Sequence, residues 1–283
     1  MKNLIVRTLT GFIYVVLLVG CTVCSPVTAF FFFGFVAAAT LYEFGTVMNH
    51  HAGASLPRAI NSLAGFILVA AVWLFSIGSA NASHMIALWA LLLLYILYIM
   101  VSELYRGSQD SIRNWSLSLA SQLYVALPFA LLPLLSINRD DEAGRMVYTW
   151  IYPLALFIFL WVNDTFAYLS GLTLHNFFPW KLFPSVSPKK TWIGSIGGCI
   201  FTLLSAVAIW YLQPGTLNLL QWLGFAAVVV VSGTFGDLVE SHLKRQLDIK
   251  DSSHILPGHG GLLDRFDSSL LAIPAVTVYF ILL

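Results

Sequence analysis

The residues best suited to chemistry lie in a polar stretch near the C-terminus, between the last two apolar runs of the chain. Residues 241–267 contain four basic and four acidic side chains, although charged residues make up only 10% of the whole sequence. Lys and Arg are frequent partners of phosphate oxygens, and Asp carboxylates bind Mg²⁺ together with substrate phosphates. This stretch therefore predicts the binding of phosphate groups with Mg²⁺ at a membrane surface.

Within this stretch, a Gly-rich turn precedes a pair of carboxylates. Gly260 and Gly261 allow the backbone to approach a ligand closely and to present successive N–H groups to a phosphate. His259 either contacts a phosphate or base or simply stabilises the turn, and both readings stay open. Asp264 and Asp267 follow as residues i and i+3 at the start of the last apolar run, beside Arg265, where the Asp264 carboxylate is placed to bind a metal ion.

A second polar set ends the apolar run before this stretch. Asp237, Glu240, Ser241 and Lys244 are spaced i, i+3, i+4 and i+7, so they share one face of a helix. We expect this face to form one wall of a cation and phosphate site, and Asp237 to share one Mg²⁺ with Asp264 if the last two spans are antiparallel neighbours. The alternative is a helix end in the headgroup layer whose charges are merely solvated.

Two further acidic residues lie within apolar runs. Asp164 follows Asn163, and a polar pair at this depth favours the wall of a cavity. Glu43 either pairs with a basic loop residue or lines the same site, and the sequence does not decide between these roles.

A second polar loop contains Ser187, Pro188, Lys189 and Lys190. Ser187 is expected to cap a helix that starts at Pro188, so that the two lysines and the helix N-terminus form an anion site. The alternative is a basic anchor at the membrane interface. Three glycines follow and are expected to permit close helix packing. They are Gly194, Gly197 and Gly198.

Composition places these segments in a membrane. Apolar residues make up 59% of the chain, and the charged share of 10% is far below the roughly 25% of soluble domains. The net charge of +1 provides no basic field, so no nucleic-acid partner is expected. Cys21 and Cys24 are spaced as C-x-x-C but lie in apolar sequence without a partner set of His or Cys, so a zinc site built on thiols is not expected.

The elements that must position the polar residues are membrane-spanning helices, each needing about 20 apolar residues. We predict an all-α polytopic membrane protein with about nine spans, forming one domain, 1–283. Residues 1–147 hold five spans, and residues 148–283 hold four spans and the catalytic loops. The expected spans are 8–24, 27–47, 60–80, 84–104, 114–136, 148–171, 191–212, 218–240 and 266–283.

The distribution of basic residues predicts the orientation. With a cytoplasmic N-terminus, all 14 Lys and Arg except Arg139 and Arg145 fall on the cytoplasmic side. The protein is therefore expected in the inner (cytoplasmic) membrane, with the polar site at the cytoplasmic face.

Together these motifs resemble the diagnostic pattern of the phosphatidate cytidylyltransferases, also called CDP-diacylglycerol synthases. The pattern reads Ser241-x-x-Lys244-Arg245, four residues, Lys250-Asp251, then Leu256-Pro257-x-His259-Gly260-Gly261-x-x-Asp264-Arg265-x-Asp267. Three upstream motifs are similar to the family as well, namely Gly236-Asp237-Leu238-x-Glu240-Ser241, Ser187-Pro188-Lys189-Lys190-Thr191-Trp192 with Gly194, and Asn163-Asp164 with Ala167-Tyr168. The chain departs from the pattern at Ile193, where the family commonly has Glu, and at Ser253, where Gly is frequent.

The resemblance implies that CTP and phosphatidate react to give CDP-diacylglycerol and pyrophosphate, in phospholipid biosynthesis. It implies Mg²⁺, leaves open a second, monovalent cation, and makes a homodimer in the lipid membrane an expectation. The implied catalytic residues are Asp237, Asp264, Lys244 and Arg265, with Asp237, Asp264, Asp267 and Glu240 as metal ligands. The implied substrate-binding residues are Ser187, Lys189, Lys190, Ser241, Arg245, Lys250, His259, Gly260, Gly261 and Asp164.

Three other functions remain alternatives. A CDP-alcohol transferase would carry clustered aspartates in an Asp-Gly-x-x-Ala-Arg context, which this sequence lacks. An ion-coupled transporter would use intramembrane carboxylates, often with repeats and helices interrupted at the midplane. Acidic residues near a Gly-rich loop at the membrane edge favour an enzyme over a transporter, and over a membrane protein that binds nucleotide without catalysis.

Overall fold

The computed structural model describes residues 2–78, 82–107, 110–140, 145–174, 179–253, 255, 258 and 260–283. Within these residues, nine helical segments are long and apolar enough to cross a membrane, as predicted. The helices are α1 (Lys2–Cys24), α2 (Pro26–His51), α3 (Arg58–Ser76), α4 (Ala82–Arg106), α5 (Ser111–Ser121), the π-helical η1 (Gln122–Ala126), α6 (Leu127–Ser136), α7 (Ile151–Leu174), α8 (Trp192–Leu212), α9 (Leu219–Gln246) and α10 (Leu263–Leu282). Helices α5, η1 and α6 together form one span, Ser111–Ser136.

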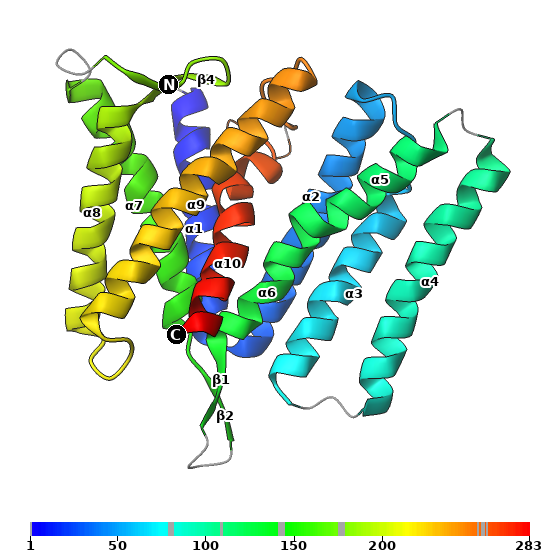
Figure 1. The fold of residues 1–283 in the computed structure, drawn as a ribbon, viewed down its shortest axis with the longest axis horizontal. Coiled ribbons are helices and arrows are strands. Elements are labelled where there is room, and N and C mark those ends of the chain that lie inside the picture. The colour runs from blue at the N-terminus through cyan, green and yellow to red at the C-terminus, as the bar shows by residue number, and fades with distance from the viewer. Residues whose placement is uncertain are drawn as a thin grey trace. The chain divides into compact units, whose positions relative to one another are not determined.

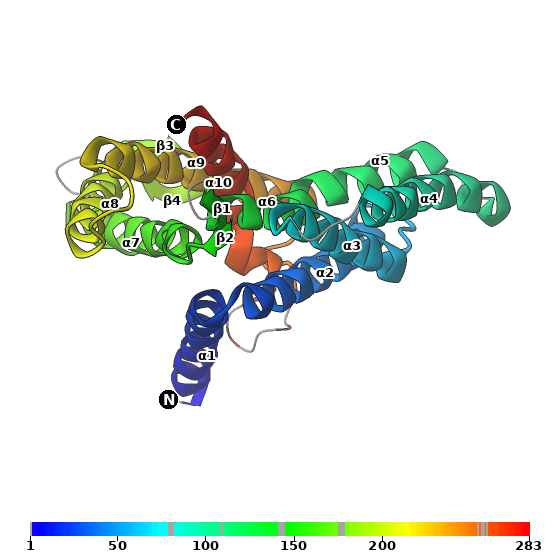
Figure 2. The ribbon, with the colours of Figure 1, turned by 90° about the horizontal axis from the view of Figure 1, so that it is seen from below.

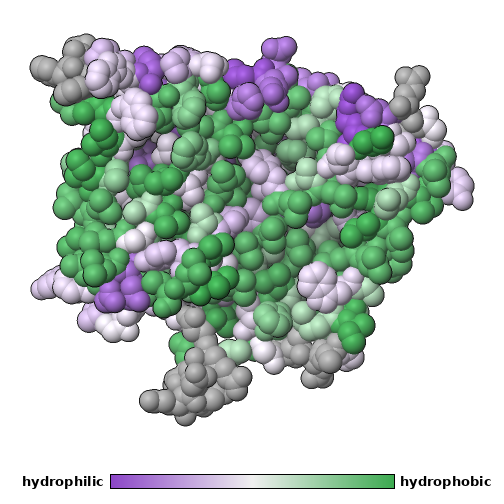
Figure 3. All heavy atoms as spheres, viewed as in Figure 1, coloured by the Kyte–Doolittle hydropathy of each residue, from purple (hydrophilic) through white to green (hydrophobic). Residues whose placement is uncertain are grey.

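Many large apolar side chains face outward. Phe12 on α1 is 65% exposed and Leu104 on α4 is 76% exposed, and apolar residues cover most of the face drawn in Figure 3. Such surfaces would be unfavourable in water, whereas helices that satisfy their own backbone hydrogen bonds are stable in lipid. The protein is therefore an integral membrane protein. The side of the membrane on which each end lies stays a prediction.

The chain packs as two compact units, residues 1–151 with 247–266, and residues 152–246 with 267–283. In the first unit, α3 packs against α2, α4 and α6, and these helices lie side by side in Figures 1 and 2. A short antiparallel hairpin of β1 (Ile137–Asp140) and β2 (Arg145–Tyr148) follows α6. The Tyr148 hydroxyl donates to the Thr22 carbonyl at 2.6 Å, which ties the hairpin to α1. The predicted single domain stays a prediction.

The second unit contains α7, α8, α9 and most of α10. A Cβ at Gly194 would lie 2.7 Å from the Ala167 carbonyl oxygen, and one at Gly198 would lie 2.7 Å from the Asn163 carbonyl oxygen. Only glycine therefore lets α8 approach the backbone of α7 this closely, and the predicted packing role of these glycines is confirmed. Aromatic side chains fill the interior, where Trp222 and Phe225 are fully buried.

Helix α8 begins later than the sequence indicated. The prediction that Ser187 caps a helix starting at Pro188 is wrong, because residues 187–191 form strand β4 (Ser187–Thr191), paired antiparallel with β3 (Lys181–Phe183). Thr191 is the N-cap instead, and its side chain accepts the Gly194 N–H at 3.2 Å. The predicted anion site at a helix N-terminus beside the two lysines is therefore not formed in that way.

Candidate active site

Asp237 is the centre of a charged cluster in the second unit. Its carboxylate forms an ion pair with the Lys190 ammonium and accepts the Ser241 hydroxyl at 3.1 Å. The side chains of Asp237 and Lys190 are 28% and 26% exposed, so both are partly accessible to solvent. This arrangement holds an acid and a base in place while leaving them within reach of a charged ligand.

The β3–β4 hairpin delivers Lys190 to this cluster. Successive residues of a strand point to opposite faces, and Lys190 is partly buried while Lys189 is exposed. Two adjacent lysines that read alike in the sequence therefore have different surroundings. Lys190 contacts a carboxylate of α9, and Lys189 lies on the exposed side of β4.

A second acid–base pair lies one turn further along α9. The Lys244 ammonium is 2.6 Å from Glu240 Oε2, and the Glu240 side chain is fully buried. A buried carboxylate is strongly unfavourable without a close partner, so Lys244 stabilises Glu240 and is itself held in one position. Because α9 continues to Gln246, all four residues of the predicted face lie on one helix.

Gly236 explains how α9 and α10 bring acidic side chains together. A Cβ at this position would lie 2.8 Å from the carbonyl oxygens of both Asp267 and Ser268, which are backbone atoms and cannot turn aside. The two helices thus touch backbone to backbone next to Asp237. Asp267 interacts electrostatically with the carboxylates of Asp237 and Asp164 and with Lys244.

Glu43 on α2 organises a separate cluster in the first unit. This carboxylate is 2% exposed, and it accepts the backbone N–H groups of Leu262 at 2.8 Å and Leu263 at 3.2 Å, together with the hydroxyl of Ser252. The N–H groups at a helix N-terminus lack partners within the helix and favour negative charge. Glu43 therefore fixes the start of α10 to α2.

Asp264 fastens the same loop from the other side. Its Oδ2 accepts the N–H of Gly261 at 2.8 Å, the N–H of Ser252 at 3.0 Å and the Ser252 hydroxyl at 2.9 Å. A metal ion bound by Asp264 would either use Oδ1 or compete with this loop for Oδ2. The Ser252 hydroxyl lies within hydrogen-bond distance of both carboxylates and donates its single proton to one of them at a time, so Ser252 links Glu43 to Asp264.

The glycines before α10 are required by this geometry. Gly260 has a φ of +79°, a backbone conformation that favours glycine. At Gly261, a Cβ would overlap the Glu43 carboxylate and the Ser252 hydroxyl. Both glycines therefore close the loop, and their predicted contact with phosphate stays a prediction. His259 lies outside the described residues.

The structure brings many of the predicted residues together but divides them between the two units. The second unit holds Asp164, Ser187, Lys189, Lys190, Asp237, Glu240, Ser241, Lys244, Arg245 and Asp267, and the first holds Lys250, Gly260, Gly261, Asp264 and Arg265. Lys250, Arg245 and Arg265 are exposed. The sharing of one cation by Asp237 and Asp264 stays a prediction.

Comparison with known proteins assigns this chain to a family. A profile described as the cytidylyltransferase family matches residues 5–283. A Staphylococcus haemolyticus protein named phosphatidate cytidylyltransferase is 30% identical over 282 residues, covering 98% of each chain. The chain belongs to the cytidylyltransferase family. The resemblance drawn from its motifs is thereby confirmed.

Other relatives of this cytidylyltransferase-family chain carry the same name. A Staphylococcus aureus protein is 42% identical over 130 residues, which cover 46% of this chain and 49% of that protein, so the match spans about half of its length. A Rickettsia prowazekii protein is 35% identical over 193 residues, covering 64% of this chain and 78% of that protein.

The donor set of this cytidylyltransferase-family chain suits Mg²⁺ bound together with a substrate. Within the described ranges, no three His, Cys, Asp or Glu side chains gather closely enough to hold a metal ion by themselves. Mg²⁺ is commonly bound by one or two carboxylates plus substrate phosphates, and Asp237 and Asp267 provide carboxylate oxygens in the second unit. Glu240 fits this role less well, because its buried carboxylate holds Lys244.

Three residues that shape these clusters in this cytidylyltransferase-family chain were not given a definite role from sequence. Ser252 lies in the polar stretch but carries no charge, and Glu43 lies 209 positions before it. The signal for Glu43 was its acidic side chain in an apolar run, which indicated a partner without identifying it. Gly236 was noted only as part of the motif around Asp237, without a packing role.

Proposed function

We propose that this chain transfers a cytidylyl group from CTP to phosphatidate, giving CDP-diacylglycerol and pyrophosphate. A phosphate oxygen of phosphatidate forms the new bond to the α-phosphorus of CTP. The bond between that phosphorus and the bridging oxygen breaks, and pyrophosphate leaves with the electron pair. The attacking group is already anionic, so no covalent protein nucleophile is needed.

The observation that carries this proposal is the cluster around Asp237 near the C-terminal end of α9. Lys190 forms an ion pair with Asp237, and Asp267 interacts electrostatically with Asp237 and Lys244. Acidic side chains for a metal ion and basic side chains for phosphates are the two requirements of phosphoryl and nucleotidyl transfer. The relatives with matching chains are named for this reaction, which favours an enzyme over the alternative of a transporter.

Lys190 exchanges partners in the proposed cycle. Without substrate, its ammonium neutralises Asp237. With the nucleotide and its metal ion bound, Lys190 leaves Asp237 and binds a phosphate oxygen. Lys244 stays held by Glu240 and binds the triphosphate or the departing pyrophosphate. Positioning and charge neutralisation of this kind supply most of the catalysis in such transfers.

Asp237 and Asp267, joined by Asp264, are the proposed Mg²⁺ ligands. Mg²⁺ bound there supplies charge neutralisation on the phosphate oxygens. The remaining residues bind substrate, as the motif implies, namely Ser187, Lys189, Ser241, Arg245, Lys250, His259, Gly260, Gly261, Asp164 and Arg265. The cytoplasmic location of the site and a homodimeric assembly belong to the proposal, because the basic-residue distribution and the family resemblance support them.

The proposal is tested with purified protein, phosphatidate, CTP and Mg²⁺, by measuring pyrophosphate release and the mass of the lipid product. Asp237→Asn should lower the rate at least about 100-fold, since it removes a charge that binds metal and orients Lys190. Asp248→Asn is the matched control, because Asp248 is an exposed carboxylate in the same polar stretch and lies outside the matched positions of the motif. Pyrophosphate release that does not require phosphatidate, or an Asp237→Asn variant with the wild-type rate, would contradict the proposal.

A further inference from the structure

A cavity of about 350 Å³ in the first unit is lined by none of the residues assigned to the proposed reaction. It lies between α2, the first turn of α3 and the end of α4. Its walls include Tyr42, Leu56 and Tyr98 together with two arginines, Arg58 and Arg106. The cavity is open to its surroundings, and two arginine side chains contribute to its lining.

Arg58 brings a positive charge to the wall, and no acidic side chain of the described residues forms an ion pair with it. Its Nη1 donates to Thr46 Oγ1 at 3.1 Å, and its guanidinium carbon lies 4.9 Å from the centroid of the Tyr42 ring. These neutral partners fix the side chain without cancelling its charge. Pro57 supplies no side-chain cap to α3, so the positive end of that helix adds to the potential.

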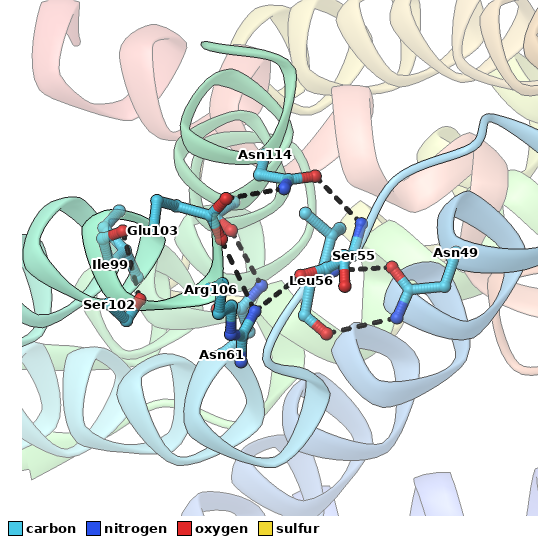
Figure 4. A network of polar contacts seen from close by, with 10 residues as sticks. Asn49, Ser55, Leu56, Asn61, Ile99, Ser102, Glu103, Arg106 and Asn114 are labelled. Carbon is cyan, nitrogen blue, oxygen red and sulfur yellow. Dashed lines mark hydrogen bonds and ion pairs between the residues drawn. The ribbon is translucent and has the colours of Figure 1, made fainter. Parts of the chain in front are cut away.

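Arg106, whose side chain is 36% exposed, is held at another wall by a polar network that includes the buried Glu103 and Asn114, which Figure 4 shows. Its Nη1 donates to the Ser55 carbonyl at 2.7 Å and lies 3.4 Å from Glu103 Oε1. Glu103 is buried and also accepts the Asn114 amide at 2.8 Å, while Asn114 Oδ1 accepts the Ser55 N–H at 2.8 Å. Three segments of the chain therefore hold this guanidinium before any ligand arrives.

The charge and position of the cavity define its ligand. The two guanidinium groups carry two positive charges, whereas the Glu103 carboxylate carries one negative charge. The wall of the cavity therefore favours an anion. The cavity lies where the α3 span begins at Arg58 and the α4 span ends at Arg106, the depth at which lipid headgroups meet a membrane protein. Leu56 and Ile60 add apolar surface. Arginine forks match phosphate oxygens, and basic pockets between spans bind anionic headgroups.

We propose that this cavity binds the phosphate of an anionic phospholipid at a site distinct from that of the reacting lipid. The inference stands apart from the proposed reaction, because it uses other residues and a binding measurement. A free phosphate shares the same chemistry, so the test must separate a lipid from a soluble phosphate ester.

Native mass spectrometry of the full chain in detergent provides that test. The probes are dioleoyl phosphatidylglycerol, an anionic phosphodiester that is not the proposed acceptor, dioleoyl phosphatidylcholine, and glycerol 3-phosphate. Phosphatidylglycerol should bind at least about tenfold more tightly than either of the others, and Arg58→Gln should weaken it by about tenfold or more. Arg113→Gln is the matched control, because Arg113 pairs with Asp110 at 2.8 Å and does not line the cavity.

Each contrary outcome overturns a defined part of the proposal. Equal binding of phosphatidylcholine would show that the anionic headgroup is not recognised. Binding of glycerol 3-phosphate as tight as that of phosphatidylglycerol would overturn the assignment to a lipid. Wild-type binding of phosphatidylglycerol by Arg58→Gln would show that this cavity is not the binding site. If that variant does not fold, Arg58→Lys replaces it, since it keeps the charge but loses the planar fork and should bind several-fold more weakly.

Discussion

Glu43→Gln is the substitution with the most specific expected effect. Glu43 accepts hydrogen bonds from Leu262 N–H at 2.8 Å, Leu263 N–H at 3.2 Å and the Ser252 hydroxyl. Glutamine keeps one acceptor oxygen but places an NH₂ group against these donors. Losing charge-assisted hydrogen bonds and leaving a buried donor unsatisfied costs about 2–4 kcal/mol in the docking of the loop. That cost corresponds to a change of about 30-fold to about 1,000-fold in the docking equilibrium.

The expected result is a loss of turnover with a specific structural cause. Because the loop carries Asp264, undocking should lower kcat at least about tenfold, with a smaller change in the KM for CTP. Hydrogen exchange should also accelerate at the amides of Leu262 and Leu263. Ser252→Ala should show a smaller loss, since both carboxylates keep their bonds to backbone N–H groups.

Tyr148→Phe is the matched control. It removes one hydrogen bond, at 2.6 Å to the Thr22 carbonyl, in the same unit but away from the loop. It should cost about 1 kcal/mol of unfolding free energy and leave kcat near the wild-type value. Wild-type turnover and wild-type amide exchange in Glu43→Gln would refute the assigned role. An equal loss of turnover in Tyr148→Phe would show that the effect follows general destabilisation.

Three further substitutions test the second unit. Gly236→Ala should reduce activity at least about tenfold and destabilise the protein by about 1–3 kcal/mol, because its Cβ would meet backbone atoms of α10. Gly20→Ala is the control, since a Cβ at Gly20 would have no atom within 4 Å. It should be neutral or stabilising in the same thermal and activity assays. Lys190→Ala should lower kcat/KM at least about tenfold, because it removes the ion pair with Asp237. Lys181 is exposed, so Lys181→Ala should leave kcat/KM unchanged. Equal losses in the two variants would show that the ion pair is not important for activity. Thr191→Val should lower the unfolding free energy by about 1 kcal/mol through loss of the α8 cap, and an unchanged denaturation midpoint would contradict that capping role.

The spans were predictable because hydropathy and length are local properties. Nine apolar runs of sufficient length correspond to the nine candidate spans found among the described residues, and only their ends differ, as at α9, which continues to Gln246. The cluster on one face of α9 was predictable for the same reason, since helical spacing alone places Asp237 below Ser241 and Glu240 below Lys244.

Contacts between distant segments were not predictable from one sequence. The predicted start of α8 was wrong because residues 187–191 pair with β3 as strand β4. This strand pairing overrides the local capping signal of Ser187. The partner of Glu43 lies more than 200 positions away, and only folding brings it there. The close contact at Gly236 depends on which helix packs against α9, and a single glycine does not encode that choice.

In the proposed reaction, this chain moves the α-phosphoryl group of CTP, with its cytidine, onto a lipid phosphate. A direct test compares CTP labelled at the α-phosphate with CTP labelled at the γ-phosphate, using purified protein, phosphatidate and Mg²⁺. We expect the α label to enter the lipid and the γ label to leave as pyrophosphate. Transfer of the γ label to lipid, or no labelled lipid from either nucleotide, would contradict it.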